Sequence, residues 1–196
     1  MSERGAIRIA GFGGTRNSKS SSVRALAVTL DAARAAGAEV ELLDLETLDI
    51  PFYEWAAKPS GDVDRLLAAF RAADGLVWAC PLYHGTISGV FKNAIDWLEV
   101  LASETPPYLA DKPVGLVGLA GGGQALQAIT AMEQIVRALR GWSIPLVVPI
   151  NRVRDAFSSE GEVLDARVHA QLTSLGHEAV RAAEIFRRAR QMASSA

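Results

Sequence analysis

The sequence has one cysteine, Cys80, among its 196 residues, so a disulfide framework within the chain is excluded. It also lacks an apolar run of the ~18 residues that a membrane span requires. Its formal net charge is −2, which leaves no positive excess for nucleic acid or an acidic membrane surface. No signal peptide is visible before the first strand-like segment. From these absences we expect a cytoplasmic protein without nucleic-acid or membrane partners.

Clusters of chemically reactive side chains are scarce as well. His169 and His177 have no carboxylate or cysteine cluster beside them, so we expect no metal site. Cys80 ends an apolar run without an obvious base, which predicts a small core residue rather than a nucleophile. The serines near residue 20 lack a Gly-x-Ser-x-Gly elbow, so a hydrolase triad has no support.

What the sequence does contain is a regular alternation of apolar and amphipathic segments. Five β–α units in a row predict a three-layer α/β sandwich: a five-stranded parallel sheet in the order 2-1-3-4-5 with helices on both faces. The length suits a single domain over residues 1–196, with 192–196 expected to fray. The expected strands are 7–12, 40–43, 76–80, 114–119 and 144–148, and the expected helices are 21–36, 63–73, 88–101, 125–139 and 164–190.

A glycine- and serine-rich segment, Gly11–Ser22, joins the first strand to the first helix. Free backbone N–H groups at the positive end of a helix make such a segment an anion cradle. It is not a P-loop, because no Gly-Lys-Ser/Thr ends it, and it lacks the third glycine of a Gly-x-Gly-x-x-Gly fingerprint. A helix cap alone would need one serine, so the many hydroxyls favour a terminal phosphate. The candidate ligands are Arg16, Ser18, Ser20, Ser21 and Ser22.

A second candidate site follows the third strand, at Pro81–Ser88. In open α/β sheets, ligands bind at the carboxyl ends of the strands. We interpret the segment as a loop in which Tyr83 and the backbone N–H groups of 83–86 suit a flat heteroaromatic ring. The alternative is an ordinary connection with Ser88 as helix cap, in which His84 is merely exposed rather than a proton donor.

Three consecutive glycines, Gly121–Gly123, follow the fourth strand. Glycine lets the backbone approach a ligand closely or take positive φ, although the run by itself predicts only a flexible loop. The first, third and fourth strands end near the switch point of a 2-1-3-4-5 sheet, so their loops are expected to converge on one pocket. This convergence indicates a ligand site more strongly than any single loop does.

Together, the three loops resemble those of the NAD(P)H-dependent FMN reductase family, a flavodoxin-like group that includes quinone, azo-dye and chromate reductases. The family's Gly-Ser-x-Arg pattern stands here as Gly13–Arg16, with Gly14 in place of the usual serine. Its Pro-x-Tyr pattern stands as Pro81–Tyr83. Its Ser/Pro-Gly-x-Leu-Lys-Asn-x-x-Asp pattern stands as Ser88–Asp96, with Phe91 in place of the usual leucine.

The resemblance extends to about residue 190 and implies a flavodoxin-like fold with bound FMN. The family's glycine pair after the fourth strand is matched as well, at Gly121 and Gly122. The resemblance implies that the phosphate lies on Thr15, Arg16, Ser18, Ser20 and Ser21, and the isoalloxazine on Pro81, Leu82, Tyr83, His84, Gly85 and Thr86, with Gly121, Gly122 and Gly123 at the opposite edge.

The activity that the resemblance implies is NAD(P)H-dependent flavin oxidoreduction. NADPH or NADH passes hydride to flavin N5, and a small-molecule acceptor (a quinone, azo dye or metal oxyanion) then takes the electrons in a ping-pong cycle. The protein orients the flavin and hydrogen-bonds it, so we nominate no catalytic side chain. Family members form homodimers or homotetramers, which would put Trp97 near a subunit interface.

Two alternatives stay open. One family branch supplies free reduced FMN to a partner flavin-dependent monooxygenase, and Ser18–Ser22 resembles that branch. Its members tend to carry a tyrosine in the helix after the fourth strand, and Ala125–Leu139 has none, which favours a retained FMN. The other alternative is a non-enzymatic electron carrier or binding module, although carriers are usually strongly acidic. The aromatic-rich segment 48–60 either shapes the acceptor pocket or packs on a neighbouring subunit.

Overall fold

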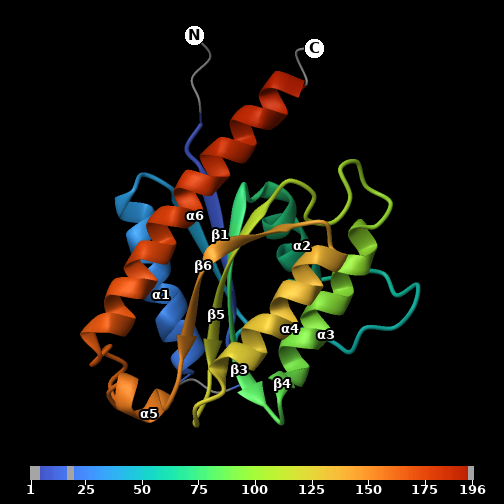
Figure 1. Ribbon diagram of the computed structural model, residues 1–196. Coiled ribbons are helices and arrows are strands. Elements are labelled where there is room, and N and C mark those ends of the chain that lie inside the picture. Colours follow the sequence, from blue (N-terminus) through green and yellow to red (C-terminus); the bar gives the residue numbers. More distant parts are fainter. Residues whose placement is uncertain (1–4, 17–19, 194–196) are drawn as a thin grey trace.

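The computed structural model describes residues 5–16 and 20–193. A central sheet carries helices on both faces (Figure 1). In chain order, the elements are β1 (Arg8–Gly13), α1 (Ser21–Ala35), β2 (Glu39–Asp44), α2 (Asp62–Ala72), β3 (Gly75–Tyr83), β4 (Thr86–Ile87), α3 (Gly89–Asp96), the 3₁₀ helix η1 (Trp97–Leu101), β5 (Pro113–Leu119), α4 (Ala125–Ala138), β6 (Trp142–Ile150), α5 (Val153–Ala156) and α6 (Ala166–Ala193).

The sheet has five parallel strands in the order β2-β1-β3-β5-β6, and the short β4 pairs antiparallel with β3. This confirms the predicted order, with β5 and β6 as the fourth and fifth parallel strands. The register sets Gly13 of β1 opposite Ala79 of β3, and Pro81 of β3 opposite Leu119 of β5. The carboxyl ends of β1, β3 and β5 therefore lie side by side.

Each face of the sheet is covered by its own group of helices. Helices α1 and α6 cover one face, and α2, α3 and α4 cover the other (Figure 1). Strand β3 shows why its sequence is a continuous apolar run: Leu76, Trp78 and Cys80 belong to one core cluster, whereas Val77 and Ala79 belong to the other. Successive strand residues point to opposite faces, and both faces of this strand are buried.

The predicted loop at Pro81–Ser88 is wrong in its conformation. Strand β3 continues to Tyr83, a two-residue turn follows, and Thr86 pairs back with Tyr83. Both turn residues have positive φ, 50° at His84 and 86° at Gly85. This is the combination that a tight turn matching the strand twist requires, and a glycine at the second position favours it.

The predicted helix 88–101 is correct at its start and too long at its end. Ser88 caps α3 by accepting the Phe91 N–H at 3.4 Å. After Asp96 the chain tightens into η1, and the Ala102 N–H then donates to the Glu99 carbonyl in the i→i+3 pattern. The short α5 was not predicted. None of the described helices is long and apolar enough to cross a membrane.

Candidate functional site

The end of β1 is shaped by two glycines that no other residue could replace without strain. Gly13 has φ +152°, and a Cβ there would lie 2.0 Å from the Ala79 carbonyl oxygen. Gly14 has φ +107°, and a Cβ there would lie 2.9 Å from Val23 Cγ2. The Gly14 N–H also points at the Ala79 carbonyl, 3.4 Å away. The chain can therefore turn tightly against β3 before α1 begins.

Ser20 is the N-cap of α1, yet its hydroxyl makes no capping bond. The residue is only 6% exposed, and its Oγ has no hydrogen-bond partner in the part of the chain that the structure describes. A buried polar atom without a hydrogen-bond partner costs free energy, so such atoms are rare unless a ligand or ion supplies the partner. The hydroxyl lies at a helix N-terminus, where an anion is stabilised by the helix dipole and by free N–H groups.

The remaining residues predicted at the first loop surround this hydroxyl in sequence. Thr15 and Ser21 are half-buried, and Arg16 is exposed. No other described residue forms an ion pair with the Arg16 guanidinium. Ser18 lies outside the described residues. A phosphate matches this set chemically, because it offers several acceptor oxygens to hydroxyl, guanidinium and backbone N–H donors.

The β3–β4 hairpin carries the second predicted set. Pro81 and Leu82 are half-buried, whereas Tyr83 is 52% exposed and the turn that follows it is exposed. Because a two-residue turn lies outside the strand ladder, the N–H groups that remain for a ligand are those of His84 and Gly85. The hairpin therefore presents apolar surface, one aromatic ring and two backbone donors at the carboxyl edge.

The third predicted loop, Gly121–Gly123, is exposed, and a Cβ at each position would meet nothing within 4 Å. None of the three has positive φ, so these glycines serve to leave the backbone open to a ligand rather than to form a tight turn. The loop is held by the turn after β6, which sequence reasoning missed. There the Arg152 N–H donates to the Gly122 carbonyl at 2.8 Å, and Asn151 Oδ1 accepts the Ala125 N–H at 2.9 Å.

The structure thus brings the three predicted loops to one edge, since each follows one of three adjacent strands (Figure 1). The first loop offers hydroxyl and guanidinium donors at a helix N-terminus, the second an apolar and aromatic surface, and the third open backbone. Such a set suits a flat ring system joined to a phosphate. This is the arrangement expected for ligands at the switch point of a parallel sheet.

Cys80 lies beneath the hairpin and is fully buried. Burial raises the pKa of its thiol to about 11, although hydrogen bonds with Ser88 oppose the increase. The Ser88 N–H donates to its Sγ at 3.4 Å. The thiol stays protonated at neutral pH and acts as a packing residue, as the sequence predicted. No group of three metal-ligating side chains occurs among the described residues.

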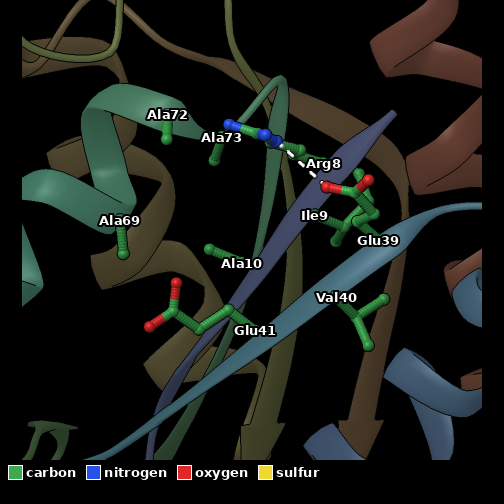
Figure 2. Close-up of a pocket in the computed structure, with 9 residues that line it drawn as sticks. All are labelled: Arg8, Ile9, Ala10, Glu39, Val40, Glu41, Ala69, Ala72 and Ala73. Atoms are coloured by element: carbon green, nitrogen blue, oxygen red, sulfur yellow. Dashed lines mark hydrogen bonds and ion pairs between the residues drawn. The ribbon is translucent and has the colours of Figure 1, made fainter. Parts of the chain in front are cut away.

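A pocket of about 270 Å³ at the other end of the sheet offers no comparable chemistry. It lies between the first residues of β1 and β2 and the alanines that end α2 (Figure 2). Its charged residues are paired within the chain: Arg8 with Glu39 at 3.1 Å, and Glu41 with Arg65 at 3.5 Å. We therefore attribute this hollow to small side chains on α2 rather than to ligand binding.

Solved structures of flavoenzymes share the fold. One is FerB, a flavoenzyme NAD(P)H:(acceptor) oxidoreductase from Paracoccus denitrificans, with a TM-score of 0.74 and 22% identity, covering 92% of this chain and 98% of that one. Another is the apo form of the NADH:FMN oxidoreductase EMOB, with a TM-score of 0.66 and 18% identity, covering 93% and 89% of the two chains.

Two curated relatives are similar in sequence. The NADPH azoreductase of Bacillus sp. (strain OY1-2) is 31% identical over 134 residues, 67% of this chain and 72% of the relative. The FMN-dependent NADPH-azoreductase of Staphylococcus haemolyticus (strain JCSC1435) is 33% identical over 118 residues, 52% of this chain. The matched stretch spans 60% of the length of that second relative.

A family comparison agrees with the loops and the fold. The sequence model described as NADPH-dependent FMN reductase matches residues 7–155, a range that contains all three candidate loops. The resemblance that the motifs carried is thereby confirmed. The chain belongs to the NADPH-dependent FMN reductase family.

Proposed function

We propose that this protein is an NAD(P)H-dependent flavin oxidoreductase that binds FMN at the carboxyl ends of β1, β3 and β5. The observation that carries the proposal is the buried Ser20 hydroxyl at the start of α1, which has no hydrogen-bond partner among the described residues. Its family, and relatives named FMN-dependent NADPH-azoreductase and NADPH azoreductase, support the same cofactor and donor.

In this proposal the phosphate binds at the first loop and the ring lies along the hairpin. The phosphate accepts hydrogen bonds from the first-loop hydroxyls and from the guanidinium, and the helix dipole stabilises its charge. The flavin ring packs on the hairpin's apolar surface, with the glycine loop at its other edge. The residues assigned are Thr15, Arg16, Ser20, Ser21, Pro81, Leu82, Tyr83, His84, Gly85, Thr86, Gly121, Gly122 and Gly123, with Ser18 retained from the sequence.

The chain's part in the reaction is binding and orientation. When bound, the flavin supplies the redox chemistry, taking hydride from a nicotinamide and passing electrons to an acceptor. The N–H groups of His84 and Gly85 would hold the ring edge, and the half-buried Pro81 and Leu82 would exclude water beneath it. No side chain is assigned a catalytic proton transfer.

The proposed acceptor is a small aromatic or quinone-like molecule, in keeping with the names of the azoreductase relatives. Release of reduced FMN to a monooxygenase is the competing function. The absence of tyrosine from α4 favours a retained cofactor, since family members that release flavin tend to carry one there.

An absorbance spectrum tests both the cofactor and its retention. The protein would be reconstituted with FMN, desalted and treated anaerobically with NADPH, then with NADH. Flavin bands that survive desalting and bleach with the nicotinamide support the proposal. Turnover that needs added free FMN supports the monooxygenase-supplying function instead. Failure to bind FMN contradicts the assignment of all three loops.

Ser20→Ala gives a prediction specific to the phosphate site. Because the hydroxyl makes no capping bond, we expect the FMN-free variant to unfold at the same urea concentration as the parent. Its dissociation constant for FMN, measured by quenching of flavin fluorescence, should increase about tenfold, because a hydrogen bond to a charged group is lost.

Ser88→Ala is the matched control, since the Ser88 hydroxyl caps α3 by accepting a hydrogen bond from the Phe91 N–H. Its loss should destabilise the FMN-free protein by about 1 kcal/mol, the usual value of a cap. If Ser20→Ala instead destabilises the free protein like Ser88→Ala, the hydroxyl serves the helix and not a ligand.

We further infer that the chain works in the cytoplasm as a homodimer or homotetramer. Large apolar side chains exposed on the side of the sheet that α2, α3 and α4 cover include Trp55 at 83% and Leu126 at 56%. Contact with a second copy would remove them from water. Trp55→Glu and Leu126→Glu together should shift the sedimentation coefficient toward the monomer, and an unchanged value would place the contact elsewhere.

A further inference from the structure

A pocket of about 350 Å³ lies beside the proposed flavin site, and the functions assigned so far make no use of it. Its walls come from three segments: the first loop, the chain after β2 and the start of α3. A volume of this size is at the lower end of what small-molecule sites show. The lining residues that matter below are Arg16, Leu48, Ile50, Phe52, Gly89 and Val90.

The wall that follows β2 is fixed in place by α3. The Asn93 side chain accepts the Tyr53 N–H at 2.9 Å and donates to the Pro51 carbonyl at 3.0 Å. Trp97 Nε1 donates to the same carbonyl at 2.9 Å, and its ring meets Tyr53 edge to face at 5.4 Å between centroids. Phe52, which lines the pocket and is 86% exposed, therefore projects from an anchored backbone.

The chemistry of the lining selects a class of ligand. Leucine, isoleucine, valine and phenylalanine side chains provide apolar contact, and Arg16 is the charged residue among those that line the pocket. Asn93 also lines it, but its amide oxygen and nitrogen already bond to the chain at 51–53. A flat hydrocarbon ring with an anionic oxygen group at one edge matches these walls, because a guanidinium pairs well with carboxylate or sulfonate oxygens.

The pocket adjoins the residues assigned to the cofactor. Arg16 belongs to the first loop, and Gly89 directly follows Ser88, the N-cap of α3 that comes after the hairpin. The guanidinium has donors on two edges of a planar fork, enough for a phosphate on one side and a second anion on the other. A molecule held here would therefore lie next to residues assigned to the cofactor.

We propose that this pocket binds an aryl group of the electron acceptor, with an anionic substituent of that ring paired to Arg16. The inference rests on the proposed function, because it names the acceptor of that reaction as an aryl sulfonate or aryl carboxylate. The pocket supplies binding through a part of the acceptor that undergoes no chemistry, which lowers KM for acceptors that carry the group.

Gly89→Leu is the test substitution. A Cβ at this position meets nothing within 4 Å and φ is not positive, so leucine fills the pocket without straining α3. Gly5→Leu is the matched control, since its Cβ also meets nothing and the residue lies outside the pocket. The binding probe is 2-naphthalenesulfonate, titrated calorimetrically into the protein with and without FMN.

We expect Gly89→Leu to weaken naphthalenesulfonate binding about tenfold or more, and Gly5→Leu to leave it unchanged. With NADPH as donor, KM for an azobenzene sulfonate should increase similarly, while the rate with ferricyanide, which has no aryl group, should stay the same. Equal effects on both acceptors, or unchanged naphthalenesulfonate affinity, would overturn the proposal.

Two outcomes distinguish failure of the aryl-group proposal from failure of the proposed function. If the wild type neither retains FMN nor bleaches with NADPH, the proposed function fails, and naphthalenesulfonate binding still tests the pocket. If Gly89→Leu changes the sedimentation coefficient but not the naphthalenesulfonate affinity, the pocket receives a second copy of the chain, and the aryl-group proposal is wrong.

Discussion

Gly13→Ala should lower the free energy of unfolding by about 3 kcal/mol or more and abolish retention of FMN on desalting. An alanine Cβ would lie 2.0 Å from the Ala79 carbonyl oxygen, and φ at this position is +152°. Both the steric overlap and the backbone conformation are unfavourable for an L residue, and strain of this kind costs about 1–3 kcal/mol even without a clash. The overlapping atom belongs to the backbone of β3, so no side-chain rotation relieves it.

The loss of FMN should follow from the same displacement. Gly13 is paired with Ala79 and begins the turn that leads to Ser20, so moving β1 away from β3 moves the anion site. Urea unfolding measures the stability, and absorbance after desalting measures retention. Gly5→Ala, where the added Cβ meets nothing within 4 Å, is the control and should alter neither. Full flavin retention by Gly13→Ala would contradict the proposed position of the phosphate.

Asp74→Ala should destabilise the protein by about 2–3 kcal/mol while leaving FMN affinity unchanged. Asp74 lies at the amino end of β3, opposite the candidate site, and its side chain is 14% exposed. It accepts hydrogen bonds from the Arg8 N–H and from the guanidinium groups of Arg187 and Arg190. Removing the acid leaves two partly buried cations near each other, and breaking a fully buried pair costs about 3–5 kcal/mol.

The same residue sets a pH dependence whose sign follows from its environment. Burial by itself raises the pKa of Asp74, but hydrogen bonds from Arg187 and Arg8, with the charges of Arg187 and Arg190, lower the pKa below the ordinary 3.8. A pKa that is lower in the folded state stabilises the fold fully above the unfolded value, and the effect is lost as pH decreases through the folded value.

Urea unfolding at pH 7 and pH 3 measures this dependence. The stability difference between wild type and Asp74→Ala should be smaller at pH 3. Glu178→Ala, which breaks an exposed ion pair with Arg181 on α6, is the control and should have little effect at either pH. An equal difference at both pH values would contradict the ionic role of Asp74.

The parallel sheet was predictable because each strand is indicated by the residues of its own segment. Leu76–Cys80 is apolar on successive positions, which a strand buried on both faces requires, and amphipathic segments alternate with such runs along the chain. The hairpin was missed because His84 takes a positive φ, which a histidine in the sequence does not predict. The Asp74 cluster was missed because its partner Arg187 is 113 residues away, and only the folded chain brings them together.

The candidate site also has a part that the sequence predicts and a part that depends on the folded structure. Its glycines and serines follow predicted strands, so their convergence could be deduced from the strand order alone. The turn at Asn151–Val153, which holds the Gly121–Gly123 loop, has no motif and depends on the fold of β6 beside β5. A serine before a helix predicts a capping hydrogen bond. Only the folded structure shows that the Ser20 hydroxyl is buried and does not make this bond.

The placement of the described chain ends has a practical consequence. Gly5 lies beside the last turns of α6, where its carbonyl accepts a hydrogen bond from Arg187, and β1 then runs the whole depth of the sheet before reaching the candidate site. The outer part of α6 extends past the sheet at that same end (Figure 1). An affinity tag, an electrode linker or a fused enzyme attached at either end would therefore face away from the carboxyl edge. Immobilised material should keep that edge open to its reactants.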